Sequence, residues 1–154
     1  MRISGAIQSI NDVTARDLQG KYSQWLIGKS QDTFGPMGPW AVTADEVDLA
    51  SYGIRCWVNG EKRQDWRFSQ LVFDIPMLIA TLSEGVTLYP GDIIATGTPA
   101  GVGIGRNLPV YLKSGDVVRI EVDGIGPFEN RFVERACPKA RPWLPRSRGR
   151  AILS

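Results

Sequence analysis

Two strand–turn–strand patterns constrain the fold of this chain more than any other feature. Within residues 54–64, apolar side chains alternate with others up to Asn59-Gly60. Asparagine and glycine tolerate the positive φ angles that a tight hairpin turn needs. A second pattern has residues 116–122 as its first strand, Asp123-Gly124 at the turn and residues 128–133 as the returning strand. We therefore expect two antiparallel hairpins in a mostly β fold.

The remaining predicted elements are short. Residues 6–10 and 93–96 are strand-like runs, and the second is expected to be a buried strand. The best helix candidate begins after Asp74, a residue type that caps helices, and has Pro76 in its first turn. An apolar face follows, and Gly85 ends the helix. The sequence thus predicts a mostly β domain with one or two short helices.

Size and composition indicate one globular domain. A chain of 154 residues can bury a core, and its 43% apolar and 22% charged residues are ordinary for such a domain. No apolar run has the length of a membrane span, so no membrane partner is expected. Cys56 and Cys137 have no metal-type spacing and make a poor disulfide framework, which predicts a cytoplasmic protein. The absence of histidine excludes histidine-ligated zinc and Ser-His or Cys-His catalysis within this chain.

Charge is distributed unevenly along the chain. Residues 1–134 hold 12 basic and 16 acidic side chains, whereas residues 135–154 hold six basic side chains, no acidic ones and three prolines. We therefore expect a domain over residues 1–134 and a basic, disordered tail over residues 135–154. Clustered arginines can attract phosphates. Composition alone favours a terminus without function, and no nucleic-acid partner is expected.

The densest set of polar groups lies at residues 11–19, directly after the first strand-like run. Two acids, one arginine and two carboxamides fall within these nine positions. Asp12 comes just past the predicted strand end, where its carboxylate could bind Mg²⁺, a cation that prefers oxygen ligands. The alternative is an ion pair between Asp12 and Arg16, four residues on, that closes a turn. Spacing alone favours the ion pair.

Residues 25–40 form a second segment, which is rich in glycine and proline and contains Lys29. A lysine in such a loop could neutralise a carboxylate or an enolate oxygen, or it could be a solvated surface charge. A phosphate-binding P-loop is excluded, because the second glycine of that motif is missing. Four tryptophans are expected to pack in the core or in a subunit interface: Trp25, Trp40, Trp57 and Trp66.

The third segment, residues 90–105, contains hydroxyl groups and closely spaced glycines. Its glycines permit close backbone approach, but their spacing is not that of a dinucleotide-binding loop. A loop that binds a small anionic substrate is one interpretation, and a plain tight turn is the other. Residues 88–94 and 112–118 also resemble each other, which predicts two similar turns, each followed by a strand.

Residues 11–19, 28–39 and 90–103 together resemble, in order and spacing, the fumarylacetoacetate hydrolase family. The resemblance covers about residues 4–135 and corresponds to the carboxyl-terminal part of the catalytic domain. It implies a mixed β-sandwich roll that forms a homodimer. It also implies metal-dependent hydrolysis or lysis of a carbon–carbon bond in short 2,4-dioxo acids, the small-molecule dicarbonyl substrates of this branch. Enol isomerisation and oxaloacetate decarboxylation are alternatives within the same family.

The resemblance also implies site residues. Asp12 corresponds to a ligand of Mg²⁺ or Mn²⁺, while Arg16, Gln19 and Lys29 correspond to catalytic groups that hold an oxyanion and an enolate. Thr33 and Thr98 correspond to substrate-binding positions, with Thr98 on the substrate carboxylate. In the family a Glu-x-Glu pair ahead of the Asp12 position completes the metal site, and no acidic residue precedes Asp12 here.

Three hypotheses about activity follow from the resemblance. The first is an enzyme that acts when the upstream part of the fold complements it. The second, from another class, is a catalytically inactive domain that serves as a structural or interaction partner. The third is a gene fragment without a function.

Overall fold

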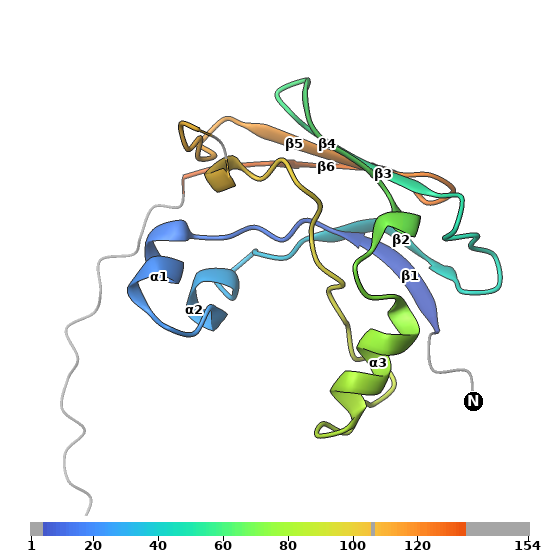
Figure 1. Cartoon of the computed structure of the whole chain (residues 1–154). Coiled ribbons are helices and arrows are strands. Elements are labelled where there is room, and N and C mark those ends of the chain that lie inside the picture. Colours follow the sequence, from blue (N-terminus) through green and yellow to red (C-terminus); the bar gives the residue numbers. More distant parts are fainter. Residues whose placement is uncertain (1–4, 106, 135–154) are drawn as a thin grey trace, which may run out of the picture.

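The computed structural model describes residues 5–105 and 107–134, which fold into two β-sheets with short helices at their margins (Figure 1). The mostly β prediction is confirmed. The predicted tail, residues 135–154, lies outside the described residues. Within the described part, no helix is long and apolar enough to cross a membrane.

The larger sheet contains both predicted hairpins. Its strands are β3 (Gly53–Val58), β4 (Glu61–Arg67), β5 (Val117–Val122) and β6 (Gly126–Arg131), in the order β4-β3-β5-β6. All three strand pairs are antiparallel. Asn59 and Gly60 have φ angles of 51° and 82°, as the first turn requires.

Each hairpin turn is also bonded to the other hairpin. The Asn59 side chain accepts a hydrogen bond from the Val117 N–H at 2.9 Å and donates one to Asp116 at 2.9 Å. At the opposite end, Asp123 accepts a hydrogen bond from the Gly53 N–H at 2.8 Å and pairs with Arg55. The hydrogen bond from Arg55 and that from Gly53 hold the pKa of the Asp123 carboxyl below its usual range.

A smaller sheet lies below the larger one in Figure 1. It pairs β1 (Ala6–Ile10) with β2 (Met37–Thr43) in antiparallel register, with an irregularity between Ile7 and Ser9. The predicted strand at residues 6–10 is thus confirmed. A two-stranded sheet has little stability by itself, so β1 and β2 depend on packing against other elements.

The hydrophobic core lies on the inner face of the larger sheet. Cys56, Val118 and Ile120 are buried there, and partly buried side chains pack around them: Ile54, Val58, Phe128 and Phe132. Burial raises the pKa of the Cys56 thiol to about 11, because the thiolate would lose its hydration. Val122 and Ile125 are the most deeply buried large side chains, at 2% and 1% exposure.

Val122 allows a direct test of where the core lies. Val122→Ala removes two buried methyl groups and is expected to lower the free energy of unfolding by about 2 kcal/mol. Val72, a residue of the same type, is 88% exposed, so Val72→Ala should change that energy by less than about 0.5 kcal/mol. Urea unfolding followed by circular dichroism measures both values. Equal values for the two variants would contradict the assigned core.

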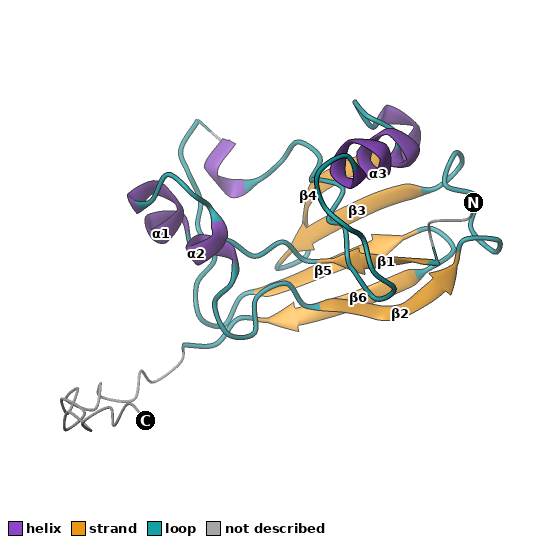
Figure 2. Ribbon diagram, turned by 90° about the horizontal axis from the view of Figure 1, so that it is seen from below, coloured by secondary structure: helices purple, strands orange, loops and turns teal. Residues whose placement is uncertain are grey.

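Three α-helices lie at the margins of the sheets (Figure 2): α1 (Arg16–Lys21), α2 (Leu26–Lys29) and α3 (Ile75–Ser83). Single 3₁₀ turns occur at Phe68–Gln70 and Gly103–Gly105. The α3 prediction is confirmed: the Asp74 side chain caps the helix by accepting a hydrogen bond from the Met77 N–H at 2.8 Å. α1 and α2 form part of the candidate site.

The strand predicted at residues 93–96 is wrong. This segment has no strand partner within the described part of the chain, and Ile93 is 64% exposed. The sequence favours a strand, but a strand forms only where another strand can pair with it. The two similar turns are confirmed: Asp92 accepts from the Tyr89 N–H at 2.7 Å, and Asp116 accepts from the Lys113 N–H at 2.8 Å. A strand follows only the second turn.

The prediction that the tryptophans pack in the core is also only partly correct. Trp57 and Trp66 are half-buried, and Trp57 lies 5.9 Å from the Arg119 guanidinium, measured to the ring centre. Trp25 and Trp40 are 63% and 61% exposed, so the core interpretation is wrong for these two. A role in a subunit interface stays a prediction.

Candidate functional site

A polar cluster forms where β1 ends and the chain turns into α1. Lys29, the last residue of α2, makes an ion pair with Asp12 and a longer hydrogen bond of 3.3 Å to the Thr14 hydroxyl. The two charged side chains are partly accessible, with exposures of 30% for Lys29 and 42% for Asp12. Two predictions need correction here. Lys29 lies in a helix and not in a glycine-rich loop, and the partner of Asp12 is Lys29 and not Arg16.

Arg16 pairs within its own helix. Its Nη1 donates a hydrogen bond of 2.7 Å to the Gln19 side-chain carbonyl. Positions three residues apart on a helix face each other, which explains this contact. The bond orients the guanidinium, whose fixed fork of donors suits a carboxylate ligand. The structure thus brings Arg16 and Gln19 together, and the chemical roles that the resemblance implied for them stay a prediction.

Gly28 brings the Asp12–Lys29 pair close to the Arg16–Gln19 pair, because it allows α1 and α2 to pack in direct contact. Its carbonyl accepts a hydrogen bond from the Ala15 N–H at 2.8 Å, next to Arg16 in sequence. A Cβ atom at Gly28 would lie 2.9 Å from the Gln19 nitrogen and 3.1 Å from the Ala15 oxygen, both of them backbone atoms. Only glycine permits this approach, so Gly28 fixes Lys29 beside the first turn of α1.

Gly28→Ala is therefore expected to separate α2 from α1 and to lower the free energy of unfolding by about 1–3 kcal/mol, because backbone must move. Gly20→Ala is the matched control. Gly20 lies in α1 with nothing within 4 Å of the place that an added methyl group would take, so alanine there should stabilise the helix by up to about 1 kcal/mol. Denaturant unfolding compares the two. A neutral Gly28→Ala would show that α1 and α2 are not closely packed.

The other two predicted site residues lie outside this cluster. Thr33 is exposed, follows α2 in the loop before β2, and has a φ angle of 71°, which is rare for a residue with a branched side chain. Thr98 accepts a hydrogen bond of 3.0 Å from Gln64 of β4, and the same amide donates to the Pro99 carbonyl at 2.7 Å. Thr98 is thus anchored to the larger sheet, and no direct bond between described residues connects it to Asp12 or Lys29.

Two residues of the cluster have roles that sequence reasoning did not assign. Thr14 contacts Lys29, and the buried Asn11 donates a hydrogen bond of 3.1 Å to the Asn130 side chain of β6. The Asn11 N–H also donates to the Pro36 carbonyl at 2.9 Å. Asn11 therefore ties the start of the cluster to β6 of the larger sheet and to the residue that precedes β2. The nearest signal in the sequence is its position directly after a strand, which does not reveal a partner 119 residues away.

The side chains described do not by themselves fit the implied Mg²⁺ or Mn²⁺. Among these residues, no group of three or more His, Cys, Asp or Glu side chains converges on a common point. The one predicted ligand, Asp12, is neutralised by Lys29. Mg²⁺ gives up its water ligands reluctantly and needs several well-placed oxygens. The role of Asp12 as a metal ligand stays a prediction, and no chemical step below depends on it.

Comparison with known proteins assigns the chain to a family. A family model described as fumarylacetoacetate (FAA) hydrolase C-terminal matches residues 5–133. The chain belongs to the fumarylacetoacetate hydrolase family. The resemblance recognised in residues 11–19, 28–39 and 90–103 is thereby confirmed.

Curated proteins similar to this chain include oxaloacetate tautomerases. The chain is 52% identical over 126 residues to the mitochondrial oxaloacetate tautomerase fahd2 of Xenopus laevis, a match that covers 80% of this chain and 40% of that protein. It is 50% identical over 124 residues to the oxaloacetate tautomerase YisK of Bacillus subtilis, with 80% and 41% coverage. The chain thus spans about two fifths of the length of the curated relatives it matches.

A solved structure confirms the fold class. A fumarylacetoacetate hydrolase from psychrophilic Exiguobacterium antarcticum is similar to this chain, with a TM-score of 0.79 and 48% sequence identity. The similarity covers 82% of this chain and 46% of that one. The mostly β fold predicted from the resemblance is therefore that of the family, and the relatives whose names state an activity are enzymes.

Proposed function

We propose that this chain provides the anion-binding side of an active site that interconverts the enol and keto forms of oxaloacetate. The observation that carries the proposal is the Lys29 ammonium group, which is held against Asp12 and Thr14. A fixed cation beside a developing enolate oxygen lowers the barrier to removing a proton from the neighbouring carbon. The two tautomerases, each at least 50% identical over the matched residues, support this reaction.

Tautomerisation requires only the transfer of a proton between carbon and oxygen. Loss of one proton from carbon 3 of keto-oxaloacetate leaves an enolate with its charge on the oxygen of carbon 2, and protonation of that oxygen gives the enol. No water is consumed and no carbon–carbon bond breaks. We assign stabilisation of this oxygen to the Lys29 Nζ. Arg16, oriented by Gln19, is assigned to a carboxylate of the substrate, because its planar donors match that group.

The remaining predictions about the site are consistent with this assignment. Thr98, anchored by Gln64, is proposed to contact the second carboxylate, and Thr33 to line the substrate position. A cytoplasmic homodimer remains part of the proposal. The second candidate function is hydrolysis of a carbon–carbon bond in short 2,4-dioxo acids, which the similarity to the Exiguobacterium antarcticum hydrolase supports.

The test is an assay that separates the possible reactions. Fresh enol-oxaloacetate is mixed with the purified chain, the enol is followed by ultraviolet absorbance, and pyruvate is measured in parallel. We expect the enol to disappear faster than in buffer while no pyruvate forms. Release of pyruvate in step with loss of the enol would mean decarboxylation. Cleavage of acetylpyruvate without any effect on enol-oxaloacetate would favour the second candidate.

A further inference from the structure

Asn59 is the one asparagine of the chain that a glycine follows. The other asparagines precede aspartate, leucine or arginine. Glycine carries no Cβ, so its amide nitrogen can approach the preceding side chain without steric hindrance. Both Asn59 and Gly60 are exposed to water in the turn of the first hairpin. This step of the chain is therefore the most open to deamidation, the loss of the side-chain amide as ammonia.

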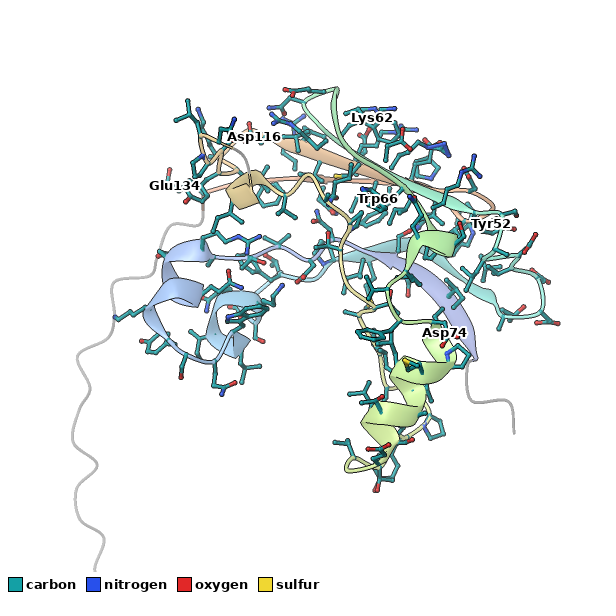
Figure 3. All side chains as sticks on the ribbon, in the orientation of Figure 1. Tyr52, Lys62, Trp66, Asp74, Asp116 and Glu134 are labelled. Atoms are coloured by element: carbon teal, nitrogen blue, oxygen red, sulfur yellow. The ribbon has the colours of Figure 1, made fainter. Side chains whose placement is uncertain are left out.

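The folded structure uses both ends of the Asn59 amide. Its oxygen accepts a hydrogen bond from the Val117 N–H and its nitrogen donates one to Asp116, each at 2.9 Å. Figure 3 shows Asp116 beside the turn of the first hairpin. The hydrogen bonds from Asn59 and from the Lys113 N–H hold the pKa of the Asp116 carboxyl below its usual range. The amide thus faces a charged carboxylate.

We propose that Asn59 is a deamidation site, at which the two side-chain hydrogen bonds delay the reaction and the product weakens the contact between the hairpins. The Gly60 nitrogen gives up its proton and bonds to the Asn59 Cγ, while the Cγ–Nδ2 bond breaks and ammonia leaves. Water then adds to either carbonyl of the cyclic imide and breaks the bond from that carbon to the nitrogen. The product is an aspartate, or an isoaspartate whose main chain passes through Cβ and Cγ. The proposal does not depend on the reaction proposed above.

The delay follows from the position of the amide. Ring closure requires the Asn59 Cγ to meet the Gly60 nitrogen, whereas the two hydrogen bonds hold the amide against the residues that begin β5. The amide must leave Asp116 and Val117 before the ring can close. Each such bond contributes roughly 1 kcal/mol, which corresponds to about a fivefold change in the population of the released amide.

Both products remove the donor that faces Asp116. An aspartate puts a carboxylate in place of the amide nitrogen, so two negative charges replace a hydrogen bond. An isoaspartate adds an atom to the main chain of a two-residue turn, whose geometry matches the flanking strands only at its normal length. Either product should loosen the first hairpin from the start of β5.

Incubation of the whole chain in water that carries heavy oxygen tests the site and the route. Trypsin then releases residues 56–62 as one peptide for mass spectrometry. We expect this peptide to gain about 3 Da, since ammonia leaves and one heavy oxygen enters, and to contain isoaspartate as well as aspartate. The folded chain should react at least about tenfold more slowly than the chain in urea. Equal rates, or a product without isoaspartate, would overturn the proposal.

Asp116→Ala should speed the reaction of the folded chain about fivefold, because the amide loses one hydrogen bond. Asp92→Ala is the matched control. Asp92 accepts the equivalent turn hydrogen bond, from the Tyr89 N–H at 2.7 Å, but has no bond to Asn59 among the described residues. Its rate should change less than twofold. Val122→Ala weakens the core without touching this turn, so an equal acceleration there would show that the reaction requires global unfolding and not release of the amide.

Asn59→Asp reproduces one product and tests its effect. Hydrogen exchange at the Val117 amide should become about tenfold faster, because a repulsion replaces a hydrogen bond to a charged group. Adding Asp116→Asn should restore slow exchange, since a donor then faces the new carboxylate from the other side. Circular dichroism checks that both variants fold. Unchanged exchange in Asn59→Asp, or no recovery in the double variant, would contradict the proposed weakening of the contact.

Discussion

Replacing Lys29 with methionine is expected to remove almost all acceleration of enol-oxaloacetate ketonisation. Methionine keeps most of the apolar stem but lacks the ammonium group that we place beside the enolate oxygen. Removal of a single donor aimed at a developing oxyanion costs about 10²- to 10³-fold in rate. Stability should fall by less than about 1 kcal/mol, because the Asp12–Lys29 pair is partly accessible to solvent. The enol assay and urea unfolding measure the two effects separately.

Lys62→Met is the matched control for this experiment. Lys62 also pairs with an aspartate, Asp65, at 2.5 Å, but it lies on the first hairpin, far from α1 and α2 in Figure 3. Its substitution removes the same charge and should leave the rate unchanged. Lys29→Arg should retain part of the activity, since the charge remains while the geometry changes. Equal rates for Lys29→Met and the unaltered chain would remove Lys29 from the proposed chemistry.

Replacing Gly101 with alanine is expected to detach the loop around Thr98 from β4. Gly101 has a φ angle of 112°, and a Cβ atom there would lie 2.0 Å from the Arg63 carbonyl oxygen. Arg63 has no partner residue on β3, because its neighbours Gln64 and Lys62 pair with consecutive residues of β3 and leave an irregularity in the register at Arg63. Backbone strain and loss of the two Gln64 hydrogen bonds together should lower the free energy of unfolding by about 3 kcal/mol.

Gly97→Ala is the control that separates the backbone strain of alanine at a positive φ angle from the steric clash with the Arg63 carbonyl oxygen. Gly97 has nearly the same φ angle, 109°, but nothing lies within 4 Å of an added Cβ. Both variants carry the strain, and only Gly101→Ala should release the loop. Hydrogen exchange over residues 98–105, together with urea unfolding, measures the difference. Similar exchange in the two variants would mean that the loop is not held by its contact with Arg63.

The elements predicted correctly from the sequence are those determined by neighbouring residues. The turn at Asn59-Gly60 requires positive φ angles that its own two residues accept, and Asp74 caps α3 within three positions. The strand at residues 93–96 depends on a partner strand instead. Its composition favours an extended backbone, but composition cannot supply the hydrogen-bonding neighbour that defines a strand.

Of the predicted site residues, the structure brings Asp12 together with Lys29 and Arg16 together with Gln19, whereas Thr33 and Thr98 lie outside this cluster. Resemblance to a family pointed to Asp12 and Lys29 without implying that they form an ion pair. Spacing suggested Arg16 as the partner of Asp12, since i and i+4 positions meet on a helix. Asp12 lies before α1 begins, so that rule does not apply. The contact with Lys29 arises because Gly28 lets α2 approach α1, a tertiary effect that local spacing does not reveal.

The hydrogen bonds of the Asn59 side chain affect how the strands of the larger sheet open locally. This one amide, in the turn of the first hairpin, bonds Val117 and Asp116 at the start of the second. Opening either hairpin at that corner breaks the same two bonds, so neither can fray there without loosening the other. The four strands should therefore open and close as one cooperative unit, and amides of both hairpins should share a single opening free energy in hydrogen exchange.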